Sequence, residues 1–198
     1  MASRTRERLI DVARQLFARK GLEKTTMNDI ATASDRGRRT IYTYFRTKED
    51  IYQAVIDSET QKILDALDAV IVGADSPRGK LRALMDFRMH LASENAHSFE
   101  VWYKGLFNRD VKRSQSIRAK VARRLFEVTT EIVDEGVASG DFDPEQARRL
   151  PSILAMTIRA NDVTTLREPD DWQSMQWLKD TVDFICAGVC RKNNNETT

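Results

Sequence analysis

The stretch SDRGRRTIYTYF, residues 34–45, decides what the rest of this chain can be. It sets three arginines around one glycine and then continues into the apolar residues Ile41 and Phe45. Neighbouring like charges repel each other, so the cluster lowers stability unless a polyanion lies close by. Because Ile41 and Phe45 are four residues apart, they would lie on one face of a helix and leave the basic side chains on the other. The stretch therefore predicts a short helix from about residue 38 to 45. The arginines are Arg36, Arg38 and Arg39.

Two more helices are expected on the N-terminal side of this stretch. Apolar residues recur at helical spacing from about residue 4 to 20, and Gly21 then provides a stop that tolerates a left-handed conformation. In TTMNDIA, residues 25–31, Thr26 can cap a helix while Asp29 completes a capping box. A tight turn at about residues 34–37 would join this second helix to the third.

The C-terminal side also reads as helical throughout. TKED at residues 47–50 is a second capping box, and it opens a long helix that ends near Gly73. Asp143 and Pro144 form a cap and a first helical residue, whereas Pro151 inside a helical pattern predicts a break just before it. No strand candidate is found, so the predicted fold class is all-α. The later amphipathic stretches lie at about 80–93, 97–107, 111–138, 144–165 and 172–190.

Basic residues are concentrated at the N-terminus. The 198-residue chain has a net charge of only +2, but residues 1–50 carry 12 basic and 7 acidic side chains. The remaining residues carry 20 and 23, so their net charge is −3. This asymmetry points to a local contact with a polyanion. No apolar run approaches the roughly 18–20 residues that span a bilayer, and no secretory signal is evident. We therefore expect a cytoplasmic protein without a membrane partner.

Three short helices with a tight turn between the second and third are typical of a helix-turn-helix DNA-binding domain. The later helix of such a domain enters the major groove, where the planar fork of arginine can bond guanine. Hydroxyls, a lysine and the amides of two helix N-termini suit DNA phosphates. The alternative is a solvated basic face on a helical bundle, but the two capping boxes and the apolar pair favour DNA binding. The hydroxyl and lysine candidates are Thr25, Thr26, Thr40, Tyr42 and Lys48.

Residues 6–51 resemble the N-terminal domain of the tetracycline-repressor (TetR) family of bacterial regulators. The resemblance implies an all-helical, homodimeric repressor whose C-terminal domain binds a small molecule. It also implies phosphate contacts from Thr26, Tyr42, Tyr44 and Lys48, and base contacts from Arg38, Arg39 and Thr40. The matching residues are Ala13, Leu16, Phe17, Gly21, Thr25, Thr26, Ile30, Ala31, Thr40, Ile41, Tyr42, Tyr44, Phe45, Lys48 and Glu49.

The turn departs from the family pattern, which usually has Ala-Gly-Val-Ser where this chain has Ser34-Asp35-Arg36-Gly37. Asp35 tolerates a left-handed conformation, and Gly37 is an acceptable helix cap. Arg36 replaces an apolar residue, and an unpaired buried guanidinium would be strongly unfavourable. We therefore expect Arg36 to turn outward toward a phosphate or to pair with Asp35. Arg39 stands where glycine is common, so its side chain would replace a close backbone approach to DNA.

The expected organisation is a DNA-binding domain over residues 1–50, a helical domain for ligand binding and dimerisation over 51–190, and a disordered tail over 191–198. Large adaptable side chains suit a small-molecule cavity, although the same pattern also fits an ordinary core. If Arg159 is buried, its charge needs a partner. The candidates are a ligand carboxylate, a nearby acidic side chain or solvent. The candidate ligand-binding residues are Met85, Met89, Phe99, Trp102, Tyr103, Phe107 and Arg159.

The last two predicted helices offer more apolar surface than one bundle needs, so we expect them to form the homodimer interface; the alternative is that they complete the monomer core. The candidates are Leu154, Ile158, Trp177, Phe184 and Ile185. The expected function is a ligand-relieved repressor that binds a palindromic operator. A ligand-independent DNA-binding protein or activator remains an alternative.

An enzyme is disfavoured, because no glycine-rich phosphate loop, nucleophile elbow or metal-ligand spacing occurs in the sequence. We expect His90 and His97 to have core or surface roles, and Cys186 and Cys190 to pack as free thiols. No cofactor and no metal is therefore expected.

Overall fold

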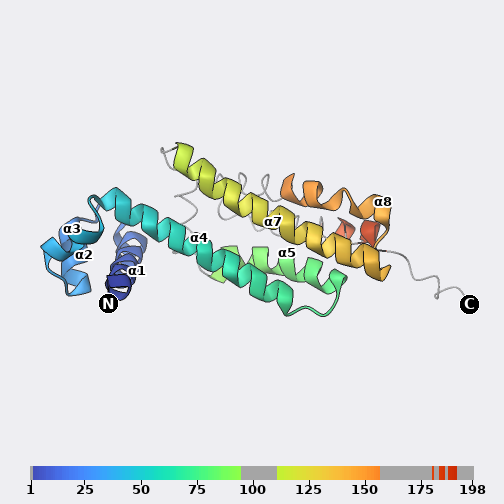
Figure 1. Cartoon of the computed structure of the whole chain (residues 1–198), viewed down its shortest axis with the longest axis horizontal. Helices are drawn as coiled ribbons and strands as arrows, with labels where there is room; N and C mark the ends of the chain where they lie inside the picture. Colours follow the sequence, from blue (N-terminus) through green and yellow to red (C-terminus); the bar gives the residue numbers. More distant parts are fainter. Residues whose placement is uncertain (1, 95–110, 157–179, 181–182, 186, 191–198) are drawn as a thin grey trace, which may run out of the picture. The chain divides into compact units, whose positions relative to one another are not determined.

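The computed structural model describes residues 2–94, 111–156, 180, 183–185 and 187–190. Within these residues every regular element is a helix, and the only β feature is an isolated bridge between Phe142 and Cys190. The predicted all-α fold class is confirmed. The helices are α1 (Ala2–Lys20), α2 (Met27–Ser34), α3 (Arg38–Tyr44), α4 (Lys48–Val72), α5 (Pro77–Glu94), α7 (Val111–Ser139) and α8 (Pro144–Ala147) (Figure 1).

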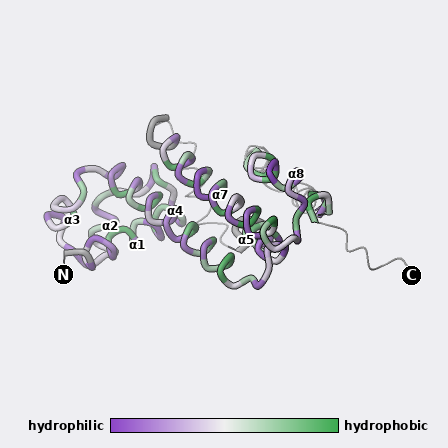
Figure 2. The backbone as a smooth tube through the Cα atoms, turned by 45° about the vertical axis from the view of Figure 1, so that its right-hand side comes forward, coloured by the Kyte–Doolittle hydropathy of each residue, from purple (hydrophilic) through white to green (hydrophobic). Residues whose placement is uncertain are grey.

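The chain divides into two compact units. The first comprises Met1–Asp65 and Leu91–Ala119, and the second comprises Ala66–His90 and Lys120–Thr198. The dividing points fall inside α4, α5 and α7, so each of these helices contributes residues to both units. Hydrophobic and hydrophilic residues alternate along α4 and α7, as expected for helices with one buried face (Figure 2).

The first unit is organised around the apolar faces of α1 to α4. The predicted inward residues are buried, including Ile41 and Phe45 at 0% and 4% exposure. Phe17 and Tyr52 meet edge to face with ring centroids 5.5 Å apart, and burial raises the pKa of the Tyr52 phenol. The other buried apolar residues of these helices are Leu9, Ile10, Ala13, Leu16, Ile30, Ala31, Ile51, Ala54, Val55, Ile56 and Leu64.

The second unit has its own apolar core. It joins the C-terminal half of α4 to α5, α7 and the segment after α8, and Phe142 is its largest fully buried side chain. Ile71, Phe87, Val121, Val137, Ile185 and Cys190 pack against it. The core residues are Leu67, Leu81, Leu84, Met85, Leu125, Val128, Ile132, Val133, Phe142, Ala147, Leu150, Leu154 and Val189.

Gly136 makes room for Phe142 within this core. A Cβ atom at Gly136 would overlap the Phe142 ring, because the ring lies directly against the backbone of α7. The backbone N–H of Phe142 donates to the Gly136 carbonyl at 2.9 Å, and the N–H of Asp143 donates to the Val189 carbonyl at 2.9 Å. These two bonds hold the connection after α7 against both that helix and the C-terminal segment.

The helix start at residues 143–144 and the break before Pro151 are both confirmed. Asp143 caps α8 by accepting from the backbone N–H groups of Glu145 and Gln146, and Pro144 is the first helical residue. The helix ends at Ala147, residues 148–149 form a turn, and helix resumes over 150–156. A proline in an unbroken helix would clash with the carbonyl four residues before it, and the turn avoids that clash at Pro151.

Candidate nucleic-acid interface

The predicted capping box at the start of α2 is present. Thr26 is extended, with φ −114° and ψ 161°, and its hydroxyl accepts from the backbone N–H of Asp29 at 3.1 Å. In return the Asp29 carboxylate accepts from the backbone N–H and the hydroxyl of Thr26 at 2.9 and 2.8 Å. These hydrogen bonds, together with Lys20 nearby, lower the pKa of Asp29 below its ordinary value of 3.8. The box fixes the first turn of α2.

The turn between α2 and α3 has the conformation that its unusual sequence predicts. Asp35 is left-handed, with φ 53° and ψ 47°, and Gly37 is the extended N-cap of α3 without a side-chain cap. The backbone N–H of Arg36 donates to the Ala31 carbonyl at 3.1 Å, which closes the end of α2. The Arg36 side chain is exposed, so the expectation that it turns outward is confirmed.

Helix α3 presents a basic outer face opposite its buried residue Ile41. Arg38, Arg39 and Tyr42 are exposed, and Tyr42 has 44% of its surface accessible. Thr40 and Tyr44 are partly buried at the edges of this face. Like charges therefore stand at the first two positions of a helix whose N-terminal amides are also positive, an arrangement that suits a polyanion.

A second capping box opens α4, also as predicted. The hydroxyl of Thr47 accepts from the backbone N–H of Asp50 at 3.1 Å, and the Asp50 carboxylate accepts from the backbone N–H groups of Arg46 and Thr47 at 3.2 and 3.0 Å. The box places Arg46, which is exposed, directly between the end of α3 and the start of α4.

Two of the predicted contact residues have partners inside the protein that sequence reasoning missed. Thr25 is fully buried, and its hydroxyl donates to the Gly21 carbonyl at 2.7 Å, so it stabilises the connection between α1 and α2. Lys48 donates from Nζ to the carbonyls of Leu22 and Glu23 at 2.8 and 3.4 Å, and is half-buried. Gly21 is left-handed, with φ 80°, and begins the connection after α1 that carries these carbonyls.

An arginine near the N-terminus of α1 contributes to the same unit. The Arg6 guanidinium lies over the Phe45 ring, 5.2 Å from its centroid, and so links α1 to the end of α3. α1 is already helical at Ala2, and Arg4 and Arg8 are exposed.

Comparison with known proteins agrees with this geometry. The family model of the bacterial regulatory proteins of the tetR family matches residues 9–55, which contain the whole candidate interface from Thr26 to Lys48 but not Arg4, Arg6 and Arg8 near the start of α1. The transcriptional repressor KstR2 of Mycolicibacterium smegmatis is 30% identical over 144 residues, which cover 71% of this chain and 68% of KstR2.

The chain belongs to the TetR family.

Solved structures support the same fold over nearly the whole TetR-family chain. A TetR transcription regulator from Haloarcula marismortui has a TM-score of 0.79 at 16% identity, covering 96% of this chain and 100% of its own. A transcriptional regulator from Saccharomonospora viridis in complex with choline has a TM-score of 0.73 at 19% identity, with coverages of 96% and 100%. This protein is therefore a DNA-binding transcriptional regulator of the TetR family and not an enzyme.

The predicted dimerisation and ligand-binding residues of this TetR-family protein are only partly described. Leu154 lies in the core of the second unit and Ile185 packs against that core, whereas Phe184 is 80% exposed. Met85 is buried in the same core. The side chain of Met89 is not described, and Ile158, Trp177, Phe99, Trp102, Tyr103, Phe107 and Arg159 lie outside the described residues, as does the predicted tail 191–198.

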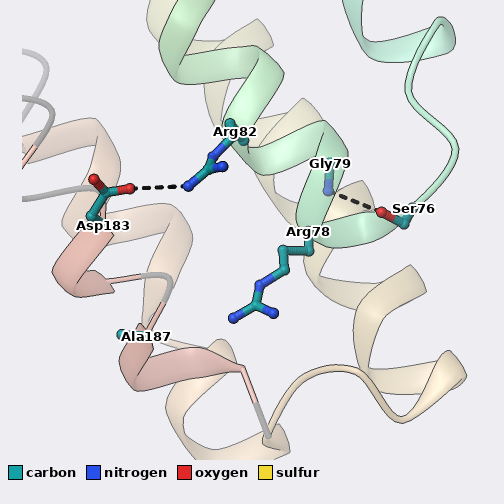
Figure 3. Close-up of a pocket in the computed structure, with 6 residues that line it drawn as sticks. All are labelled: Ser76, Arg78, Gly79, Arg82, Asp183 and Ala187. Carbon is teal, nitrogen blue, oxygen red and sulfur yellow. Dashed lines mark hydrogen bonds and ion pairs between the residues drawn. The ribbon is translucent and has the colours of Figure 1, made fainter. Parts of the chain in front are cut away.

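The second unit also contains a hollow of about 650 Å³ beside the start of α5. Arg78 and Arg82 extend from α5 toward the segment that carries Asp183 and Ala187, and Arg82 Nη2 lies 3.4 Å from Asp183 Oδ1 (Figure 3). Ser76 and Gly79 complete the lining. Among the described residues that line the hollow, none is a predicted ligand-binding residue.

Among the described residues no group of three histidine, cysteine or acidic side chains is placed to hold a metal ion. None of the helices in the described part of the chain is long and apolar enough to cross a bilayer.

Proposed function

We propose that this regulator is a homodimeric repressor that binds a palindromic operator and releases it when a small molecule binds the C-terminal region. The observation that carries the proposal is α3, where Arg38 and Arg39 occupy the exposed first turn while Ile41 anchors the opposite face. The helix is thus fixed from behind and presents its first turn outward, as a recognition helix must. Such a regulator would work in the cytoplasm, with residues 1–50 acting on DNA and 51–190 on the effector and the partner subunit.

The exposed residues divide into two groups by chemistry. Arg38, Arg39 and Thr40 would read base edges from the first turn of α3, because a guanidinium can bond O6 and N7 of guanine together. The surrounding groups would hold phosphates and set the register of the complex. These are Thr26, Arg36, Tyr42, Tyr44 and Lys48. We leave Thr25 out of this set because it is fully buried, whereas Thr26 is exposed and Lys48 is only half-buried.

Exposed apolar side chains in the C-terminal region support the homodimer. Met156 and Phe184 are 73% and 80% exposed, and Ile153 is 44% exposed. Covering large apolar side chains that otherwise face water is favourable, and a second copy of the same surface would cover them in a symmetric dimer. A symmetric dimer also presents two recognition helices to a palindromic site, one helical turn of DNA apart.

The proposal that a small molecule releases the DNA rests on a related structure and on the coupling between ligand binding and DNA binding. The related fold from Saccharomonospora viridis was solved with choline bound, which supports a small-molecule site in this fold. A ligand that binds better to a state in which the two recognition helices no longer fit the DNA would shift the population toward that state. A coupling of about 1–3 kcal/mol would weaken operator binding about 5–150-fold. The pocket candidates remain Met85, Met89, Phe99, Trp102, Tyr103, Phe107 and Arg159.

The direct test is binding of the full chain to a duplex selected by that chain from a randomised library, measured at several salt concentrations. We expect affinity to fall steeply as salt rises, because phosphate contacts release counterions. Arg38→Ala or Arg39→Ala should each lose about 1–3 kcal/mol of discrimination at one base pair.

Arg148→Ala is the matched control, since it removes an exposed arginine from the other unit. It should leave discrimination unchanged. A chain that enriches no sequence, or α3 variants that discriminate as well as the parent, would refute base reading by α3.

A further inference from the structure

The two exposed arginines at the start of α3 differ in what lies beside them. The guanidinium carbon of Arg38 lies 5.9 Å from the centroid of the Tyr42 ring, one helical turn later. Among the described residues no aromatic ring lies against the guanidinium of Arg39, whose backbone carbonyl accepts from the Thr43 hydroxyl at 3.1 Å. The sequence alone does not distinguish the two arginines. Of the pair, only Arg38 has an aromatic ring of the described residues beside its guanidinium.

The contact between Arg38 and the Tyr42 ring affects how Arg38 can recognise a base. A free arginine side chain samples many rotamers, and a bidentate contact with guanine requires it to give up most of that freedom. A ring face that attracts the cation restricts these rotamers before DNA arrives, so less freedom is lost on binding. A single misplaced rotamer loses the second hydrogen bond of the fork, and with it most of the discrimination between bases.

The Tyr42 ring is placed to give this support. Tyr42 is 44% exposed, so part of the ring faces solvent on the same side of α3 as Arg38. Residues four apart on a helix are neighbours, and the spacing from Arg38 to Tyr42 meets this condition. More than half of the Tyr42 surface is covered, so the ring has less freedom than a fully exposed side chain.

We propose that Tyr42 has two separable roles: its hydroxyl holds a phosphate, and its ring positions Arg38 for base reading. The phosphate role belongs to the proposed function, on which this inference rests. The ring role is new, and it makes Tyr42 a specificity-determining residue that touches no base. Arg39 reads its base without that help.

The test compares Tyr42→Phe and Tyr42→Leu in the full chain, using the duplex selected by the parent and a set of duplexes with single base-pair changes. Tyr42→Phe keeps the ring, so affinity should fall by the same factor for every duplex and discrimination should be unchanged. Tyr42→Leu removes the ring. It should in addition lower discrimination about 2–5-fold, the size expected for a cation–π contact at an exposed site.

The position of that loss identifies its cause. Tyr42→Leu should act at the base pair where Arg38→Ala acts, and not at the one where Arg39→Ala acts. In the Arg38→Ala background, Tyr42→Leu should cause no further loss of discrimination, because the arginine that it positions is gone. The inference is overturned if Tyr42→Leu leaves discrimination intact, acts at another base pair, or acts equally with and without Arg38.

A general disturbance of the fold gives a different pattern. It would lower the melting temperature and weaken binding to all duplexes together, without selecting one base pair. If Tyr42→Leu weakens binding to all duplexes equally, this result therefore counts against the role of the ring. If the parent chain enriches no sequence at all, the proposed function fails and this inference fails with it. If the parent selects a sequence and Tyr42→Leu discriminates between duplexes as well as the parent does, the inference fails but the proposed function stands.

Discussion

At the scale of single residues, the structure separates positions that the sequence could specify from those that depend on distant partners. Thr26, Asp35 and Asp143 have the conformations that their sequence neighbours predict, because caps and turns are formed by residues within three or four positions. Thr25 and Lys48 could not be assigned in this way. The partners of Lys48 are the carbonyls of Leu22 and Glu23, which lie 26 and 25 positions away along the chain. Thr25 bonds the Gly21 carbonyl only four positions away, but its complete burial is set by the packing of the unit and not by its sequence neighbours.

Gly136 gives the clearest prediction at this scale. Replacing a glycine by alanine inside a helix normally stabilises it by up to about 1 kcal/mol. In Gly136→Ala the new methyl group would overlap the buried Phe142 ring, so we expect a net loss of about 1–3 kcal/mol in the free energy of unfolding. The measurement is the midpoint of urea unfolding.

Gly188→Ala is the control, since a Cβ atom at Gly188 would meet no described residue within 4 Å beyond its own neighbours and helix backbone. It should be neutral or slightly stabilising. The packing argument fails if Gly136→Ala is as stable as Gly188→Ala.

At the scale of elements, helix starts and stops were predictable because they have local signals. The long helix α4 begins at its capping box and ends just before Gly73, and the break before Pro151 follows from the proline alone. The close contact of α7 with Phe142 had no local signal. It depends on a chain reversal at Gly140, with φ 82°, that brings the ring back onto the helix it has just left.

The capping box of α2 predicts a pH dependence. The pKa of Asp29 is lowered in the folded protein, so the charged carboxylate stabilises the fold at pH values above 3.8, the ordinary pKa of the unfolded chain. This contribution should be lost as the pH falls below 3.8 toward the lowered value. The measurement is the melting temperature of the parent and of Asp29→Asn from pH 7 to pH 3.

The expected result is that the parent is the more stable protein at pH 7, and that the difference between the two narrows as acid protonates Asp29. Other carboxylates titrate in both proteins alike, so the comparison isolates Asp29. A difference that stays constant down to pH 3 would mean that the charge of Asp29 does not stabilise the capping box.

At the scale of the whole molecule, the sequence showed both an excess of basic residues at the N-terminus and an excess of apolar residues near the C-terminus. Only the first could be interpreted from the sequence alone. The N-terminal basic excess maps to the exposed arginines of the turn and of α3, as predicted. The apolar residues near the C-terminus could not be divided beforehand between core and interface. The structure assigns Leu154 to the core and leaves Met156 and Phe184 exposed, because helical position alone does not say which neighbour covers a face.

The central claim is that two copies of this chain each place α3 into the major groove of one palindromic duplex. The most direct measurement is a hydroxyl-radical footprint of the full chain on its selected duplex, with Phe184→Asp as the control that places a charge in the exposed apolar surface. We predict two symmetric protected patches about 10–10.5 base pairs apart for the parent. Phe184→Asp should lose this paired pattern at the same protein concentration. A single patch, or no protection at low salt, would contradict the account.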